Sequence, residues 1–209
     1  DMETPVCLNL NRFAERSNGI FGKTGTGKTF LTRLALCGLI RSGNAVNFIF
    51  DMHNEYGHQG MKESASGRSF VKGLKQIFGN RVAIFSLDPR SSRERNVQPD
   101  YEVYISYEDI EVEDIAPLQE ELRLNPTAVE SAYLVYAIYK ERWLEALLRR
   151  EGKEVEEFAE EIGAHPGSLV ALHRKLKRLE SFPFIKVRRP EGGDVIGRIM
   201  EYIEQGIHI

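Results

Sequence analysis

The sequence predicts an α/β protein in which a parallel β-sheet carries a glycine-rich loop and an α-helical bundle is inserted into the sheet domain. Three observations support this fold class. Short apolar runs alternate with helical patterns in the first half of the chain, which is typical of a parallel sheet with right-handed crossovers. A glycine-rich motif lies between a predicted strand and a predicted helix. From Glu108 to Glu180 the strand signal almost disappears.

The first half of the chain supplies the expected sheet. Its apolar runs are short and end in glycine or polar residues, whereas its helices have apolar residues at a spacing of three to four. We expect strands at 18–21, 44–51, 81–87 and 101–107, and helices at 29–41 and 69–78.

The second half supplies the bundle and then returns to the sheet. Asn125 lies before Pro126, a typical helix start. We expect helices at 127–150, 155–162 and 168–179, a strand at 184–187, and a last helix after Asp194 that ends at Gly206. The expected domains are a nucleotide-binding core made of 1–107 and 181–209, and a helical insertion at 108–180.

Composition excludes several classes of protein. The 209 residues are 42% hydrophobic and 28% charged, as in soluble globular proteins. Cys7 and Cys37 lie in apolar stretches and are expected to be reduced core residues of a cytoplasmic protein. No apolar stretch approaches the ~20 residues of a membrane span. With a net charge of −3, any surface that binds nucleic acid must be local.

The ends of the chain suggest a fragment of a longer protein. Asp1 precedes Met2, and Gly206 is followed by what could be the start of a strand at 207–209. The alternative is a tag residue at one end and a natural C-terminus at the other.

The strongest motif is the phosphate loop, which matches G-x-x-x-x-G-K-[ST] at every fixed position. Its glycines allow backbone N–H groups to point at phosphate oxygens, and the following helix adds its positive end. Lys28 is expected to contact the β- and γ-phosphates, and Thr29 to bind magnesium. We therefore expect ATP with Mg²⁺ to bind at Gly22, Lys23, Thr24, Gly25, Thr26, Gly27, Lys28, Thr29 and Phe30.

A second candidate element is the apolar strand that ends in Asp51. In parallel sheets, ligands bind beyond the carboxyl ends of the strands, so Asp51 is expected near the phosphate loop, where it could hold magnesium. Glu55 could activate the attacking water as a general base. Alternatively, Asp51 caps the next turn and Glu55 is a surface acid. A zinc site at His53 and His58 lacks further ligands nearby.

These two motifs together resemble the HerA branch of the FtsK/HerA superfamily of DNA translocases. GIFGKTGTGKTFLTRL is followed, one helix later, by IFDMHNEYG. Members of the family carry Asp-x-His-x-Glu-Tyr at this place. Met52 and Asn54 stand where proline and glycine are usual, and every charged position is kept. The resemblance is specific over 18–57 and weaker over the helical region.

The resemblance implies a P-loop NTPase with a RecA-like core that hydrolyses ATP to move duplex DNA in DNA repair or end processing. It implies a homo-hexamer that works beside a NurA-type nuclease. The chain departs from the family in having no N-terminal β-barrel and no later strand that ends in Asp-Glu, although 207–209 could begin it.

Three basic clusters are candidates for sequence-independent contact with DNA phosphates. They are Arg90, Arg93 and Arg95; Lys186, Arg188 and Arg189; and residues 173–178 (HRKLKR). Each could instead be a solvated surface.

Other functions stay open at this point. A P-loop small-molecule kinase could use the helical insertion as a lid, and a non-catalytic module could bind ATP to assemble a ring. A GTP-binding switch is disfavoured because no Asn-Lys-x-Asp element is present.

Overall fold

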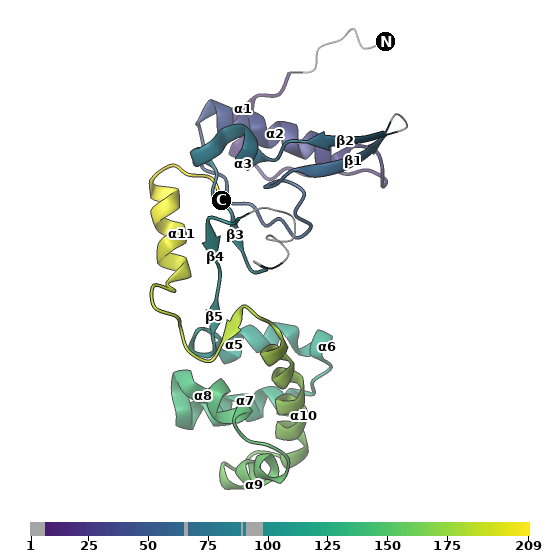
Figure 1. Ribbon diagram of the computed structural model, residues 1–209. Helices are drawn as coiled ribbons and strands as arrows, with labels where there is room; N and C mark the ends of the chain where they lie inside the picture. The colour runs from purple at the N-terminus through teal and green to yellow at the C-terminus, as the bar shows by residue number, and fades with distance from the viewer. Residues whose placement is uncertain (1–6, 65–66, 89, 91–97) are drawn as a thin grey trace. The chain divides into compact units, whose positions relative to one another are not determined.

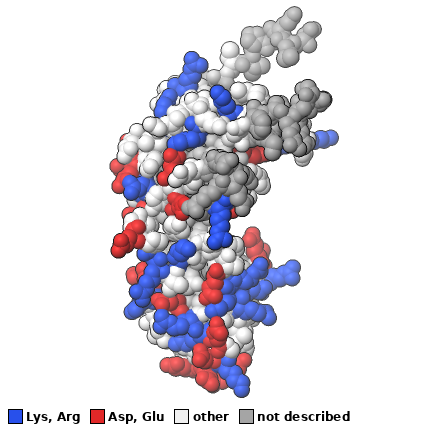
Figure 2. Space-filling model, in the orientation of Figure 1, with Lys and Arg blue, Asp and Glu red and all other residues white. Residues whose placement is uncertain are grey.

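The computed structural model describes residues 7–64, 67–88, 90 and 98–209, with only the backbone for 60–64 and 67–70 (Figure 1). The chain packs into two compact units. The first comprises the chain up to Glu102 together with Val195–Ile209, and the second comprises Val103–Asp194. On the face drawn in Figure 2, acidic and basic side chains are interspersed, in keeping with the net charge of −3. None of the described helices has the length and apolar character needed to cross a membrane.

The first unit contains four described α-helices and a short 3₁₀ turn, η1 (Gly79–Arg81). The helix predicted at 29–41 is confirmed as α2, and its last turn ends at Gly43, whose N–H donates to Leu39 O. The helices are α1 (Leu10–Ala14), α2 (Lys28–Ser42), α3 (Leu74–Phe78) and α11 (Val195–Glu204).

The prediction of a helix at 69–78 is wrong for the first half of this range. Residues 67–71 form β2 (Gly67–Val71), which pairs in antiparallel register with β1 (Gly60–Ser64). The N–H of Leu74 donates to Tyr56 O at 2.9 Å, so α3 begins where the chain packs against the loop before β1.

Parallel backbone pairing links distant parts of the first unit. β3 (Phe85–Ser86) pairs with β4 (Tyr101–Glu102). Ile209 N–H donates to Asn47 O at 2.9 Å, and Ile49 N–H donates to Ile209 O at 2.7 Å. On its other side this segment forms a parallel bridge between His208 and Val82. The extended segment predicted at 207–209 therefore lies between 47–49 and 81–83.

Three predicted strands differ from the structure. Residues 101–107 do not form one strand, because Tyr101–Glu102 and Ile105–Ser106 are separate short strands in different units. Residues 18–21 form no strand, and the Phe21 side chain is 93% exposed. Residues 44–51 were expected to be buried, but only 47–49 take part in pairing and Phe50 is 83% exposed. An apolar run becomes a regular strand only where a neighbouring strand satisfies its backbone groups, and the described residues pair with neither 18–21 nor the ends of 44–51.

A small core holds the first unit together. Ile40, Leu74 and Val82 are its buried centre, and Cys37 packs against them. Burial raises the pKa of the Cys37 thiol. Cys7, in contrast, is exposed, so its predicted core position is wrong.

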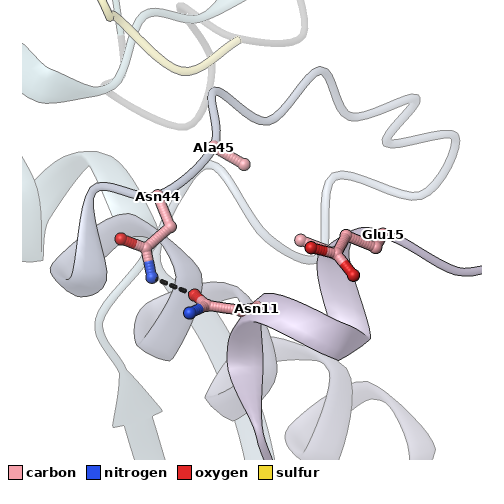
Figure 3. A pocket seen from close by; sticks show the side chains of 5 residues that line it. Asn11, Glu15, Asn44 and Ala45 are labelled. Carbon is pink, nitrogen blue, oxygen red and sulfur yellow. Dashed lines mark hydrogen bonds between the residues drawn. The ribbon is translucent and has the colours of Figure 1, made fainter.

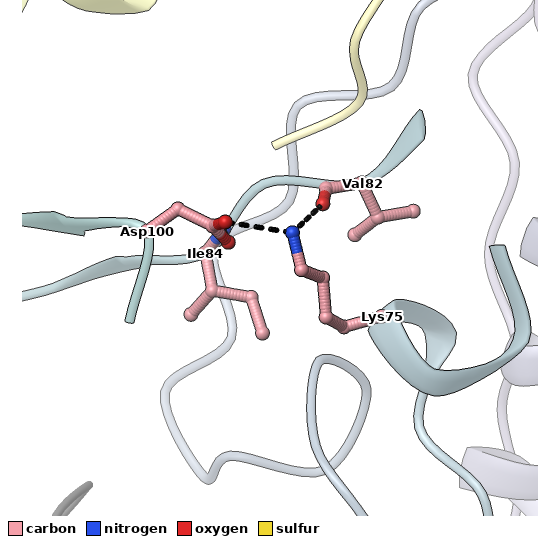
Figure 4. Close-up of polar contacts among 4 residues, drawn as sticks. All are labelled: Lys75, Val82, Ile84 and Asp100. Atoms are coloured by element: carbon pink, nitrogen blue, oxygen red, sulfur yellow. Dashed lines mark hydrogen bonds and ion pairs between the residues drawn. The ribbon is translucent and has the colours of Figure 1, made fainter. Parts of the chain in front are cut away.

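A polar contact fastens α3 to the edge of the paired strands (Figure 4). The Nζ of Lys75 donates to Asp100 Oδ1 at 2.7 Å and to Val82 O at 2.8 Å. Asp100 Oδ2 accepts from Ile84 N–H at 2.8 Å. One carboxylate thus joins the helix to the start of β4.

The second unit is mainly helical, as the sequence predicts for this part of the chain. Its two short strands, β5 (Ile105–Ser106) and β6 (Ile185–Lys186), pair in parallel. The α-helices are α5 (Val112–Ile115), α6 (Gln119–Leu122), α7 (Pro126–Tyr139), α8 (Trp143–Leu148), α9 (Lys153–Glu161) and α10 (Pro166–Leu176). The 3₁₀ turns are η2 (Tyr107–Asp109), η3 (Ala116–Leu118), η4 (Lys140–Arg142) and η5 (Lys177–Ser181).

The predicted N-terminus of α7 is confirmed, but the single helix at 127–150 is wrong. Asn125 Oδ1 accepts from Ala128 N–H at 3.1 Å and caps the helix. The chain turns at Lys140, which has a φ of +52°, and starts again as α8. The break seats Trp143, which is fully buried and donates its indole N–H to Ile110 O at 2.8 Å.

The core of the second unit is larger than that of the first. It is formed by apolar side chains of α5, α7, α8, α9 and α10, so each helix buries one face against the others. Its fully buried members include Val112, Val135, Trp143, Leu144, Leu147, Leu169 and Leu172.

Candidate nucleotide-binding site

The phosphate loop leads directly into α2. Gly25 and Gly27 have φ values of +83° and +89°, a backbone conformation that side chains with a Cβ disfavour. Thr26 Oγ donates to Lys23 O at 2.7 Å and closes the turn. Since α2 begins at Lys28, the loop lies directly before the N-terminus of this helix, where free N–H groups attract anions.

Lys28 lies across this loop. Its Nζ donates to Gly22 O at 2.8 Å and to Lys23 O at 2.9 Å. Both partners are backbone carbonyls of the loop itself, so the ammonium group is held at the place where the loop can wrap a phosphate. The loop is exposed from Gly22 to Gly27, which leaves it accessible to a ligand.

Thr29 connects the loop to the second predicted element. Its hydroxyl donates to Glu55 Oε2 at 3.2 Å, although the two residues are 26 positions apart. A hydroxyl and a carboxylate are the hard oxygen ligands that Mg²⁺ prefers. The Thr29 hydroxyl could therefore bind the magnesium ion of a triphosphate, and the Glu55 carboxylate beside it could accept a proton from a water molecule.

Arg33 fixes the backbone of Glu55. It lies one turn after Thr29 on α2, is only 9% exposed, and donates a guanidinium N–H to Glu55 O. Arg33 was not among the site residues predicted from the sequence. Its role could have been suspected from the sequence, because Arg33 is a cation within the apolar run of α2 and a buried charge needs a polar partner.

Asp51 organises the loop that carries Glu55. Its carboxylate accepts backbone N–H bonds from Glu55 at 2.8 Å, Tyr56 at 2.9 Å and Gly57 at 3.3 Å. Asn54, with a φ of +53°, makes the turn between them. The geometry thus brings Glu55 against Thr29, the residue after Lys28, and it gives Asp51 the position of a loop-holding carboxylate.

The remaining predicted residues lie around this centre. Lys23 and Thr24 are exposed on the loop, and Phe30 is 54% exposed on the first turn of α2. His53 is exposed. Among the residues described, no group of three or more His, Cys, Asp or Glu side chains is placed to hold a metal ion.

A comparison with protein families now adds to this geometry. A family model described as the central domain of helicase HerA matches residues 1–209. The chain belongs to the HerA central-domain family. Membership implies an ATPase-type function and nucleotide binding. No curated protein and no solved structure matches the chain.

A separate hollow on this HerA-family chain lies between α1 and the turn after α2 (Figure 3). It measures about 460 Å³. Asn44 Nδ2 donates to Asn11 Oδ1 across it. The charged group in its lining is the carboxylate of Glu15, which repels anions. This hollow therefore does not suit a phosphate.

The basic clusters of the HerA-family chain differ in how far they are engaged. Arg90 is exposed, whereas Arg93 and Arg95 lie outside the described residues. In the second cluster, Lys186 lies over the Tyr104 ring at 5.4 Å and Arg189 pairs with Asp109. Arg188 is exposed.

The pairing with Arg189 affects the ionisation of Asp109. Partial burial alone would raise the pKa of Asp109, but hydrogen bonds from Ser106 and the Arg189 guanidinium lower it below its usual value. Arg189 therefore stabilises the ionised form of Asp109, and the two side chains form a local ion pair.

Proposed function

We propose that this chain binds ATP with Mg²⁺ at residues 22–29 and hydrolyses it as part of a motor that moves duplex DNA. The observation that carries the ATPase part is the hydrogen bond between Thr29 and Glu55, beside Lys28 at the start of α2. It brings a magnesium ligand, a candidate base and a phosphate-binding cation to one place.

Each residue has a role in the proposal. Loop N–H groups and Lys28 hold the β- and γ-phosphates, and Thr29 holds magnesium. The bound metal ion supplies neutralisation of the charge that develops on the phosphates. Glu55 orients the attacking water and accepts its proton. Asp51 and Arg33 hold the Glu55 backbone from two sides, and Asp51 also has the charge to bind magnesium through water.

The DNA part of the proposal is supported by family membership and by the basic clusters. In this reading the motor is a cytoplasmic homo-hexamer that moves DNA without reading its sequence and works with a nuclease in DNA end processing. A small-molecule kinase would ignore DNA, and an assembly module would change size with ATP but release no phosphate.

The decisive experiment measures phosphate release from ATP with and without duplex DNA. The chain and a version extended through its natural reading frame are compared, with Lys28→Ala as the blank. We expect Lys28→Ala to lose most of its ATP affinity in calorimetry because the loop loses its phosphate-binding cation. DNA should accelerate turnover, and the acceleration should shrink as salt rises.

Three results would contradict the proposal. Unchanged ATP affinity in Lys28→Ala would reject the loop assignment. Turnover that is indifferent to DNA in both chains would reject the motor. ATP-dependent change of size without phosphate release would favour an assembly module.

A further inference from the structure

Helices α9 and α10 form a compact helix pair with a tight turn. α9 ends at Glu161 and α10 begins at Pro166, so residues 162–165 are the whole connection. Figure 1 views α9 nearly end-on while α10 runs along the page, so the two helices cross steeply. Two helices joined steeply by a short turn that contains glycine are the arrangement of a helix-turn-helix.

The turn is fixed by specific interactions. Gly163 has a φ of +73°, and Ala164 N–H donates back to Ala159 O at 2.8 Å, which closes α9. His165 Nδ1 accepts from Ser168 N–H at 3.3 Å and caps α10. The direction of α10 is thereby set by the end of α9.

The two helices also bury one face of each against a shared core. Phe158 and Ala159 of α9 and Leu169 and Leu172 of α10 are each at most 2% exposed. Because these residues fix which face of α10 is inside, the opposite face is presented to solvent. α10 is thus supported as a rigid element.

The outer face of α10 changes character along its length. Near its start it presents Gly167, which is exposed, and Ala171, which is half-buried. One turn further on it presents Arg174, and Arg178 follows in η5, both exposed. No acidic residue occurs from Pro166 to Leu179.

The cations of this face are available for a partner. Among the described residues, the side chains of Arg174, Lys175 and Arg178 form no hydrogen bond or ion pair. Lys177 behaves differently, because its Nζ donates to Leu148 O at 3.0 Å and pairs with Glu180 at 3.0 Å. The Lys177 ammonium group is therefore used in contacts within the second unit.

The charge is separated between the two helices. α9 carries five glutamates, Glu154, Glu156, Glu157, Glu160 and Glu161, whereas α10 carries no acidic residue. A surface hollow of about 320 Å³ is lined by His173, Arg174, Lys177 and Arg178. An anionic partner would therefore approach α10 and avoid α9.

We propose that α9 and α10 are a helix-turn-helix that docks α10 into the major groove of duplex DNA. The small residues Gly167 and Ala171 allow the start of α10 to approach the base edges closely, and Arg174 and Arg178 contact the flanking phosphates. The face carries no Asn or Gln and no cation near its start to read bases, so binding does not depend on sequence. This inference rests on the DNA part of the proposed function.

The test is binding of the 209-residue chain, without nucleotide, to a fluorescent 30-base-pair duplex by anisotropy over a range of salt. Arg174→Ala/Arg178→Ala is the test variant. The control is Lys140→Ala/Arg142→Ala, which removes the same charge from exposed positions of η4 in the same unit. Both variants change exposed side chains, and circular dichroism checks that each one folds.

We expect the test variant to bind on the order of tenfold more weakly at physiological salt. Its slope of log K against log salt should fall by about 1.8, as for two lost phosphate contacts. The control variant should change affinity less than about twofold. The major-groove ligand methyl green should displace the chain, and the minor-groove ligand netropsin should not.

Equal weakening in both variants, or displacement by netropsin alone, would overturn the helix-turn-helix. If either result occurs while DNA still accelerates ATP turnover, the proposed motor stands and contacts DNA elsewhere. If the chain and its extended version neither bind DNA nor respond to it, both proposals fail.

Discussion

At the scale of single residues, the site depends on Glu55 being held in place. Its side chain meets the Thr29 hydroxyl, and its backbone is bound by Arg33 and Asp51. Three groups thus converge on one loop: two side chains of α2 and the Asp51 carboxylate at the end of one extended segment. A residue so constrained is typical of a positioned catalytic group.

Replacing Glu55 tests its role as a base. Glu55→Gln keeps the size and the contact with Thr29 but cannot accept a proton. We expect kcat for ATP hydrolysis, measured in the extended chain, to fall on the order of 10²- to 10⁴-fold while calorimetric ATP affinity changes less than about threefold. Glu15→Gln, at an exposed position of the separate hollow, is the control. Lost affinity with normal turnover at saturation would contradict the role.

His208 makes the first unit sensitive to acid. It is 2% exposed, and its Nδ1 accepts from Asn47 N–H at 3.0 Å. Burial, with a smaller effect of the Arg81 charge, lowers the pKa of His208 below 6.5. The neutral ring therefore stabilises the fold fully above pH 6.5, and this stabilisation is lost as pH falls from there through the lowered pKa.

We expect the urea concentration at the unfolding midpoint of the first unit to decrease when the pH is lowered from 7.5 to 5.5. In His208→Asn this decrease should be smaller. Burial also lowers the pKa of His173, which lies in the second unit. The second unit should therefore lose stability of its own as the pH falls. A pH dependence that is the same in His208→Asn would show that other groups cause it.

At the scale of elements, helix boundaries could be predicted where residues at the helix end form the cap. α2, with its glycine loop and glycine stop, and α7, with its Asn125 cap, are confirmed because side-chain chemistry at those positions is local. The break at Lys140 was missed because it is set by the burial of Trp143, a tertiary effect. The antiparallel pairing of β1 with β2 was missed for the same reason, since pairing overrides the helical pattern.

One helix end offers a stabilising substitution. Arg123 closes α6 with a φ of +52° and ψ of +50°, a left-handed conformation that glycine adopts without strain. We expect Arg123→Gly to stabilise the second unit by about 0.5 to 1 kcal/mol. The measurement is the urea midpoint by Trp143 fluorescence. Arg142→Gly, where φ is −93°, should not stabilise. A loss of stability in Arg123→Gly would contradict the argument.

At the scale of the whole molecule, each unit has its own core. The phosphate loop and Glu55 are both in the first unit, so the predicted site residues lie in one body. The sequence indicated the phosphate loop in full because its motif is contiguous. The contact between Thr29 and Glu55 could be expected only from the sheet topology, and the part played by Arg33 needed the structure.

Two cores predict two unfolding transitions. Trp143, the single tryptophan, is fully buried in the second unit, so its fluorescence reports that unit alone. Far-ultraviolet circular dichroism reports both. We expect the two signals to have different urea midpoints, and Lys75→Met, which breaks the contact with Asp100, to shift only the transition not seen by fluorescence. Coincident transitions in every variant would show one cooperative body.

The pairing of residues 207–209 between 47–49 and 81–83 has a consequence for how the chain folds during synthesis. These partners are separated from the closing segment by more than a hundred residues, whereas the helical unit is built from near neighbours in the chain. Local contacts form early and distant ones late. The helical unit can therefore fold while the ribosome is still translating, whereas the strand pairing in the unit that holds the phosphate loop must wait for the last residues of this segment to emerge.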